Sequence, residues 1–163
     1  KISSLSKKKL DIHLMVQKPN EIIDLYCLPT TEIISIHYES ECDFNLTFNK
    51  LKEKNIKCGI AINPDTKISS IKPLLNLVDL VLVMSVYPGR GGQILINKTF
   101  NKILELKKIT NKKNHSIKIS VDGGVDDTNS KNLINIGCDI LVSGTYLIKS
   151  ENIEKSIKSM LKR

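Results

Sequence analysis

Short apolar segments alternate with longer amphipathic segments along the whole chain. The apolar segments predict strands at Leu10–Val16, Ile33–His37, Cys58–Ile62, Leu80–Val86, Ile117–Val121 and Ile140–Ser143. Several of them are almost continuously hydrophobic, which is typical of strands covered on both faces in a parallel sheet. The amphipathic segments predict helices at Asn20–Cys27, Asn45–Asn55, Ile68–Asn76, Lys98–Thr110, Asp127–Asn135 and Asn152–Leu161. Six βα units joined by short connections predict one α/β domain over residues 1–163.

Two local signals mark the ends of the helix expected at Asp127–Asn135. Asp127 or Thr128 has a side chain suited to the N-cap position, because its oxygen can accept a hydrogen bond from a free backbone N–H. Gly137 suits the position just past the last helical residue, where a left-handed backbone is common.

The alternation alone does not decide between an open doubly wound sheet and a closed barrel. No G-x-G-x-x-G motif follows the first strand, so a Rossmann dinucleotide site has little support. Polar and glycine residues instead fall in or just after several strands, at His13, Asn63–Pro64, Ser85–Gly92, Asp122–Gly124 and Ser143–Thr145. All strand carboxyl ends of a barrel converge on one site, so this distribution favours a barrel.

Composition indicates a soluble globular protein, with 40% hydrophobic and 26% charged residues. The longest apolar run, Val78–Val86, contains Asp79 and is far shorter than the roughly 20 residues of a membrane span. The basic N-terminus lacks the apolar core of a signal peptide, so we expect a cytoplasmic protein. The sequence starts at Lys1 instead of a methionine, and we therefore expect a processed, trimmed or incomplete product. The four cysteines are widely spaced and are expected to be buried free thiols in a reducing cytosol.

The net charge of +8 raises the question of nucleic-acid binding. The lysines are scattered along the chain, however, and there is no Trp and only three Phe to stack on bases. We therefore expect no nucleic-acid partner, although a positive field can attract phosphorylated substrates. The alternative, a basic RNA-binding module, predicts steeply salt-dependent binding.

Asp122 and His13 are the first candidates for chemistry. Asp122 ends an apolar strand, where a charge is costly unless it is paired or bound to a metal, and Gly123–Gly124 leave room for a ligand. An Asx-turn that ends the strand is the structural alternative. His13 faces the same side of its strand as Asp11 and Met15, either as a hydrogen-bonded core residue or as a metal ligand. His37 has the same two interpretations with less support.

Two glycine-containing loops are candidates for an anion site. Tyr87–Gln93 has three glycines in four positions, which lets backbone N–H groups turn towards an anion. Ser143–Thr145 follows the last strand, where β/α barrels commonly complete a phosphate site. A tight structural connection is the alternative for each loop, but together they make a phosphate site plausible.

These residues, in this order and spacing, resemble the ribulose-phosphate 3-epimerase family. The matching segments are Leu10–Val16, Ile36–Glu39, Gly59–Thr66, Val83–Gln93, Val121–Val125 and Val142–Thr145. The resemblance runs nearly from end to end. It implies a (β/α)8 TIM barrel in which Leu10–Val16 is strand 3, so that strands 1 and 2 are absent from this chain. A complete barrel of this kind usually needs at least about 200 residues.

The resemblance also implies a metal-dependent site that converts D-ribulose 5-phosphate to D-xylulose 5-phosphate through an enediolate, by proton transfer between two carboxylates. His13 and Asp122 would bind the metal and contact the substrate, and Asp122 would be a catalytic acid/base. Met15 and Met84 would border the reacting carbons. The phosphate would lie against Gly89, Gly91, Gly92, Gly123, Gly124, Gly144 and Thr145. The family's second carboxylate and a further metal-binding histidine come from strand 2, and a substrate-binding serine comes from strand 1.

Arg90 departs from the family pattern, because an aromatic residue is common at this position. It would add a cation for the phosphate or flank the entrance. The cofactor is expected to be a divalent ion such as Zn, Fe, Mn or Co, and the partner a phosphorylated ketose. Six of eight strands would leave two open edges, from which a homo-oligomer or another association is expected. Alternatives are an epimerase for a related phosphoketose such as allulose 6-phosphate, another phosphate-binding barrel activity, and a non-catalytic truncated remnant or interaction protein.

Overall fold

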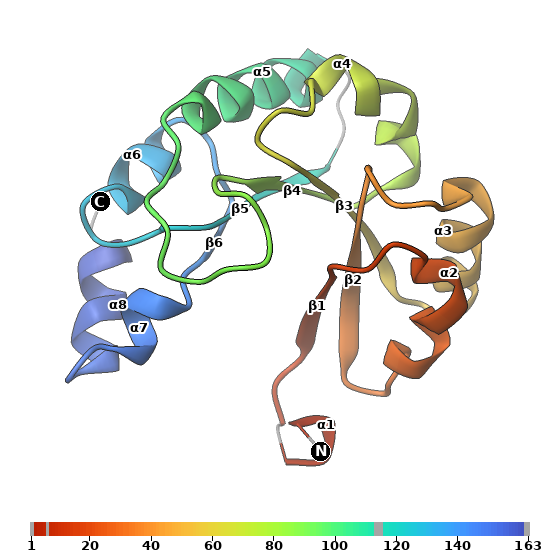
Figure 1. The fold of residues 1–163 in the computed structure, drawn as a ribbon, viewed down its shortest axis with the longest axis horizontal. Coiled ribbons are helices and arrows are strands. Elements are labelled where there is room, and N and C mark those ends of the chain that lie inside the picture. The colour runs from red at the N-terminus through yellow and green to blue at the C-terminus, as the bar shows by residue number, and fades with distance from the viewer. Residues whose placement is uncertain (1, 6, 113–115, 162–163) are drawn as a thin grey trace.

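Six parallel strands form one sheet in which every strand pairs with the next in the sequence. The structure is a computed structural model that describes residues 2–5, 7–112 and 116–161. The strands are β1 (Leu10–Leu14), β2 (Thr31–His37), β3 (Lys57–Ile62), β4 (Leu80–Met84), β5 (Lys118–Asp122) and β6 (Ile140–Val142). Figure 1 shows the sheet curling into an open arc, with helices α3 to α6 along its outer side. The predicted parallel α/β arrangement is confirmed, and the strand order is that of a partial barrel.

Each predicted amphipathic segment contains helical structure, and the short helices α1 and α7 were not predicted. The helices are α1 (Ile2–Leu5), α2 (Pro19–Ile22), η1 (Ile23–Tyr26), α3 (Phe44–Glu53), α4 (Ile68–Ile71), η2 (Lys72–Leu77), α5 (Lys98–Lys112), α6 (Ser130–Asn135), α7 (Thr145–Ile148) and α8 (Ile153–Leu161). The segment expected as one helix at Ile68–Asn76 is an α-helical turn followed by a 3-10 helix. Pro73 lies at this transition and has no N–H to continue the α-helical hydrogen bonds.

Two hydrophobic layers bury both faces of the central strands. Val81 and Val83 of β4 belong to the large cluster between the sheet and the helices. Leu80, Leu82 and Met84 of the same strand point to the inner face, where they pack with Ile33 and Ala61. This period of two residues confirms that the continuous apolar run of β4 is a strand covered on both sides. Because all strands are parallel, their carboxyl ends lie at the same edge of the sheet.

The start of α6 differs from the sequence expectation. Its N-cap is Asn129, not Asp127 or Thr128. The Asp126 side chain accepts hydrogen bonds from the N–H and the hydroxyl of Thr128, and the Asn129 side chain accepts one from the Asp126 N–H. These bonds form a turn over residues 126–129, so the helix begins only at Ser130.

The end of α6 agrees with the sequence expectation. Gly137 has a φ of 103° and directly follows the C-cap residue Ile136. Its N–H donates to the Ile134 carbonyl at 3.0 Å, and the next N–H donates to the Leu133 carbonyl at the same distance. A left-handed residue with this pair of bonds is the usual way to end a helix.

All four cysteines are free, but only two are buried as expected. Cys58 and Cys138 lie in the core, where burial raises the pKa of each thiol to about 11. Cys27 and Cys42 are half-buried. In the part of the chain that the structure describes, no helix combines the length and the apolar character that a membrane crossing requires.

Candidate functional site

A cavity of ≈ 1070 Å³ opens beside the carboxyl ends of β4, β5 and β6. Eleven of the twelve residues selected from the sequence line it: Met15, Met84, Gly89, Arg90, Gly91, Gly92, Asp122, Gly123, Gly124, Gly144 and Thr145. The long connection between β4 and α5 borders it on the inner side of the arc (Figure 1). The structure therefore brings together residues from four separate segments of the sequence.

His13, the twelfth residue, contacts the edge of this group through Asp122. Its Nδ1 atom lies 3.9 Å from Oδ2 of Asp122, and the two side chains are 14% and 27% exposed. The Nδ1 atom is buried and has no hydrogen-bond partner. The ring is therefore placed with one nitrogen facing a carboxylate across a short gap.

Two bonds of about 2 Å each, the usual lengths for zinc to nitrogen and carboxylate oxygen, can span the gap between His13 and Asp122. An imidazole nitrogen and a carboxylate oxygen are also an ordinary ligand pair for Zn, Fe, Mn or Co. These two residues therefore fit one divalent ion. No group of three His, Cys, Asp or Glu residues suited to a metal occurs among the described residues.

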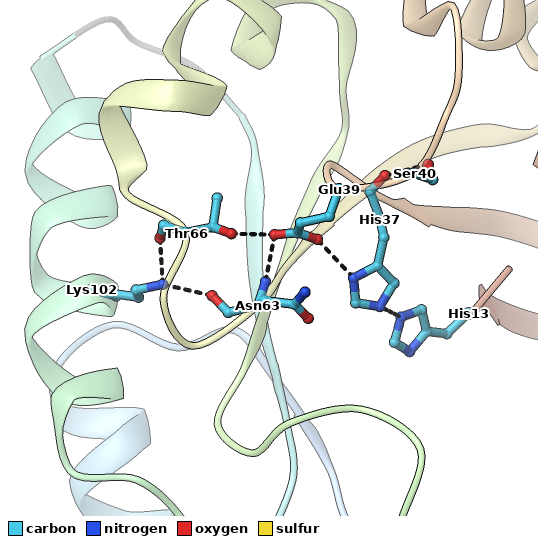
Figure 2. A network of polar contacts seen from close by, with 7 residues as sticks. All are labelled: His13, His37, Glu39, Ser40, Asn63, Thr66 and Lys102. Atoms are coloured by element: carbon cyan, nitrogen blue, oxygen red, sulfur yellow. Dashed lines mark hydrogen bonds and ion pairs between the residues drawn. The ribbon is translucent and has the colours of Figure 1, made fainter. Parts of the chain in front are cut away.

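The other nitrogen of His13 belongs to a hydrogen-bonded chain of side chains (Figure 2). Nε2 of His13 lies 2.8 Å from Nε2 of His37, and Nδ1 of His37 lies 3.0 Å from Oε2 of Glu39. The second Glu39 oxygen accepts a hydrogen bond from the Asn63 N–H at 2.9 Å and another from the Thr66 hydroxyl. His37 had little support from the sequence alone, and Glu39 was not among the predicted site residues. Their separation by two residues at the end of a strand was the available signal, because it predicts side chains on one side.

The Glu39 carboxyl is strongly biased towards its ionised form. Partial burial would raise its pKa, but hydrogen bonds from His37, Thr66 and the Asn63 backbone outweigh this effect and lower the pKa to about 2. Asp11, on the same face of β1 as His13, shows the opposite shift. Burial raises the pKa of the Asp11 carboxyl, His13 opposes this rise, and the charges of Asp122 and Glu32 add to it.

The glycine loops pack against one another at the far side of the cavity. A Cβ atom on Gly91 would lie 3.2 Å from Oγ1 of Thr145, so the loops after β4 and β6 are nearly in contact. Gly124 has a φ of +63°, and a Cβ atom there would lie 2.6 Å from both the Gln93 carbonyl oxygen and the Leu95 nitrogen. The loop after β5 can approach the loop after β4 this closely only because residue 124 has no side chain.

Comparison with known proteins agrees with this geometry. The model of the family described as "Ribulose-phosphate 3 epimerase family" matches residues 1–148. Ribulose-phosphate 3-epimerase of Helicobacter pylori (strain J99) is 38% identical over 98% of this chain and 73% of its own length. The Bacillus subtilis enzyme of the same name is 33% identical over 93% of this chain and 70% of its own length.

Solved structures show the same fold at low sequence identity. A tryptophan synthase α-subunit variant from Pyrococcus furiosus has a TM-score of 0.72 at 18% identity, over 96% of this chain and 67% of that chain. A 3-hexulose-6-phosphate synthase has a TM-score of 0.59 at 12% identity, over 80% of this chain and 60% of that chain. The family match, the relatives and the barrel-like fold lead to one conclusion: this chain belongs to the ribulose-phosphate 3-epimerase family, a family of isomerases that act on carbohydrates.

Proposed function

We propose that this site takes part in the 3-epimerisation of a ketopentose phosphate, converting D-ribulose 5-phosphate to D-xylulose 5-phosphate. The relatives named ribulose-phosphate 3-epimerase support this substrate. The observation that carries the proposal is the approach of His13 Nδ1 to the Asp122 carboxylate beside a glycine-lined cavity. An uncharged nitrogen, a carboxylate and a wall of backbone N–H groups are what a phosphorylated enediolate needs around it.

Asp122 would exchange a proton with C3 of the substrate. The C3 hydrogen lies next to the ketone, so its removal gives an enediolate whose negative charge is shared between two oxygens. Inversion requires that the proton leave from one face and return to the other, and therefore requires two acid/base groups. Asp122 ends β5 and lines the cavity, from where it would serve one face. The family pattern assigns the second group to an aspartate on a strand that precedes Leu10–Val16.

His13 and Asp122 would together hold a divalent ion such as Zn, Fe, Mn or Co. Such an ion, when bound, stabilises negative charge on the substrate oxygens as a Lewis acid. His13 would provide an imidazole nitrogen to the ion and Asp122 a carboxylate oxygen. The side chains of Met15 and Met84 line the same cavity with an apolar, non-basic surface that does not compete for the proton.

The glycine loops would bind the substrate phosphate. Gly91, Gly92, Gly123, Gly144 and Thr145 line this side of the cavity, and their backbone N–H groups and the Thr145 hydroxyl would be the donors. The exposed Arg90 adds a positive charge to the same wall. A second candidate function follows from this residue, because a guanidinium in place of an aromatic side chain favours a different or longer phosphoketose, such as allulose 6-phosphate.

We also assign the six strands to positions 3 to 8 of an eight-stranded barrel, so that residues 1–163 form one partial barrel domain. The barrel-like solved structures and the share of the relatives that the chain covers support this assignment. β1 and β6 are then the open edges of the sheet, and association into a homo-oligomer would cover them. Light scattering of the purified protein measures the oligomeric state.

Solvent exchange at C3 tests the proposed reaction directly. The protein is incubated with ribulose 5-phosphate or xylulose 5-phosphate in D2O with Mn²⁺ or Co²⁺, and the C3 proton is followed by NMR. One carboxylate is enough to exchange the proton on one face, whereas two are needed for inversion. We expect Asp122-dependent deuterium incorporation at C3 of at least one epimer. No incorporation into either sugar, or equal incorporation with Asp122→Asn, would contradict the proposal.

A further inference from the structure

The two nitrogens of the His13 ring lie in different surroundings. Nε2 faces His37 at 2.8 Å, with the two ring planes inclined by 23°. Nδ1 is buried, has no hydrogen-bond partner and faces Asp122. A neutral imidazole carries its proton on one nitrogen only, and the hydrogen bond of the other nitrogen decides which. The partners of His37 therefore determine what His13 presents to the cavity.

Glu39 determines which atoms donate and which accept along the hydrogen-bonded chain. Its Oε1 atom accepts from the Asn63 N–H and the Thr66 hydroxyl, and its Oε2 atom faces Nδ1 of His37 at 3.0 Å. An ionised carboxylate can only accept hydrogen bonds, so Nδ1 of His37 must carry a proton. The low pKa of the Glu39 carboxyl keeps it ionised at neutral pH.

The position of the proton on His37 then determines the position of the proton on His13. With a proton on Nδ1, a neutral His37 has a lone pair on Nε2 and accepts a hydrogen bond from Nε2–H of His13. This leaves a lone pair on Nδ1 of His13. The reverse direction would place an N–H on that buried atom, where no acceptor lies within hydrogen-bond distance. A proton there would also keep a cation away from Asp122.

We infer that His37 and Glu39 are positioning residues that hold the His13 proton on Nε2 and so keep its Nδ1 lone pair directed at Asp122. The inference deepens the proposed function and rests on it for the purpose of this arrangement. Carboxylate or backbone partners that orient a ligating histidine commonly change metal affinity by about 10–100-fold when they are removed. Here a second histidine stands between the ligand and the carboxylate.

Helix α5 contacts the two residues that donate hydrogen bonds to Glu39. Nζ of Lys102 donates to the Asn63 carbonyl at 2.8 Å and to the Thr66 carbonyl at 2.5 Å (Figure 2). These two residues supply the donors that hold Glu39. The ends of β2 and β3 and one long helix therefore fix the position of Glu39, as expected for a group whose geometry must be precise.

Glu39→Gln should reverse donors and acceptors along the hydrogen-bonded chain with little change in the shape of the side chain. The Gln carbonyl oxygen would remain with the Asn63 N–H and the Thr66 hydroxyl, because both are donors there. The amide NH2 group would then face Nδ1 of His37 and convert this nitrogen from a donor to an acceptor. His37 would carry its proton on Nε2, and His13 would be driven to the tautomer with a proton on Nδ1.

NMR of the metal-free protein with ¹⁵N-labelled histidine measures this tautomer directly. The chain has three histidines, so substitution of each one assigns its signals. We expect His13 to carry its proton on Nε2 in the unmodified protein and on Nδ1 with Glu39→Gln. Glu41→Gln is the matched control, because Glu41 is exposed and two residues farther along the chain. His13 protonated on Nδ1 in the unmodified protein, or no change with Glu39→Gln, would overturn the inference.

Substitutions of His37 separate positioning from folding. The end of a Gln side chain reaches the place of Nε2 and can still accept from His13, whereas Asn reaches only the place of Nδ1. We expect His37→Gln to retain the His13 tautomer and His37→Asn to lose it, with circular dichroism showing that both variants fold. In Co²⁺ titrations, His37→Asn should weaken binding by about 10–100-fold and His37→Gln by much less. Equal behaviour of the two variants would contradict the positioning role.

The His13 tautomer and the Co²⁺ affinity test different claims, so one can be contradicted without the other. If the unmodified protein binds no Co²⁺, the proposed metal site fails, while the tautomer experiment still gives its own answer. If Co²⁺ binds but Glu39→Gln leaves both the tautomer and the affinity unchanged, the positioning role fails and the proposed function stands.

Discussion

His13 on β1 and Asp122 on β5 lie at opposite parts of the sheet, yet their side chains approach to 3.9 Å. Three strands separate them in the order of the sheet, so they meet only because the sheet curls. In a flat sheet, strands lie about 4.8 Å apart, and residues four strands apart would be separated by roughly 19 Å. The curvature of the barrel therefore creates the site.

Asp122→Asn tests the acid/base role. Asn cannot exchange a proton with carbon, so we expect C3 exchange to fall by about 10²–10⁴-fold or more. The Asp122 side chain is partly exposed and is not part of the hydrophobic core, so the thermal unfolding temperature should change little. Exchange close to that of the unmodified protein would refute the role of Asp122.

His13→Ala tests the metal-binding role. Loss of one of two protein ligands should reduce the metal content of the purified protein and weaken binding by at least about 10–100-fold, the effect of losing even an indirect partner. Metal analysis of purified protein and Co²⁺ titration measure these quantities. An unchanged metal stoichiometry would count against His13 as a ligand.

Gly124→Ala tests the packing of the glycine loops. The new Cβ atom would lie 2.6 Å from two backbone atoms, at a positive φ that side chains rarely adopt, so we expect a loss of about 1–3 kcal/mol in the free energy of unfolding. Gly144→Ala is the matched control, because a Cβ atom there meets nothing within 4 Å. Urea unfolding compares the two variants. Equal stability of both would show that the loops do not pack as described.

The lowered pKa of the Glu39 carboxyl predicts a loss of stability in acid. Its pKa in the folded protein is about 2, below the usual value of 4.5, so the unfolded chain binds the proton more tightly. The stabilisation is complete above pH 4.5 and disappears as the pH falls towards about 2. Glu39→Gln removes this titration and should flatten the dependence of the unfolding free energy on pH in that range. An identical dependence in both proteins would contradict the hydrogen bonds assigned to Glu39.

All six strands overlap apolar segments that were predicted as strands from the sequence. The signal was clearest for β4, whose continuous apolar run is buried on both faces. The glycines of three loops were found because they follow strand ends, which the fold brings to one edge, whereas Met15 and Met84 were assigned only from the family resemblance. The start of α6 was missed because Asp126 forms a local turn that competes with helix formation. The short helix α7 was missed because four residues give no periodicity.

The hydrogen bond between His37 and His13 was beyond sequence reasoning. It depends on the parallel register of β1 and β2, which pairs His13 with Ser35 and places His37 two residues farther along the same face. No local pattern gives this register. Glu39 likewise depends on donors from Asn63 and Thr66, which lie in a different loop.

A crystal structure of the protein with Co²⁺ tests the shared cation most directly. Anomalous scattering locates the ion independently of the protein atoms. We predict a single ion within about 2 Å of His13 Nδ1 and of an Asp122 oxygen, with His13 Nε2 still bonded to His37. An ion bound elsewhere, or held by Nε2 of His13 instead of Nδ1, would contradict the account.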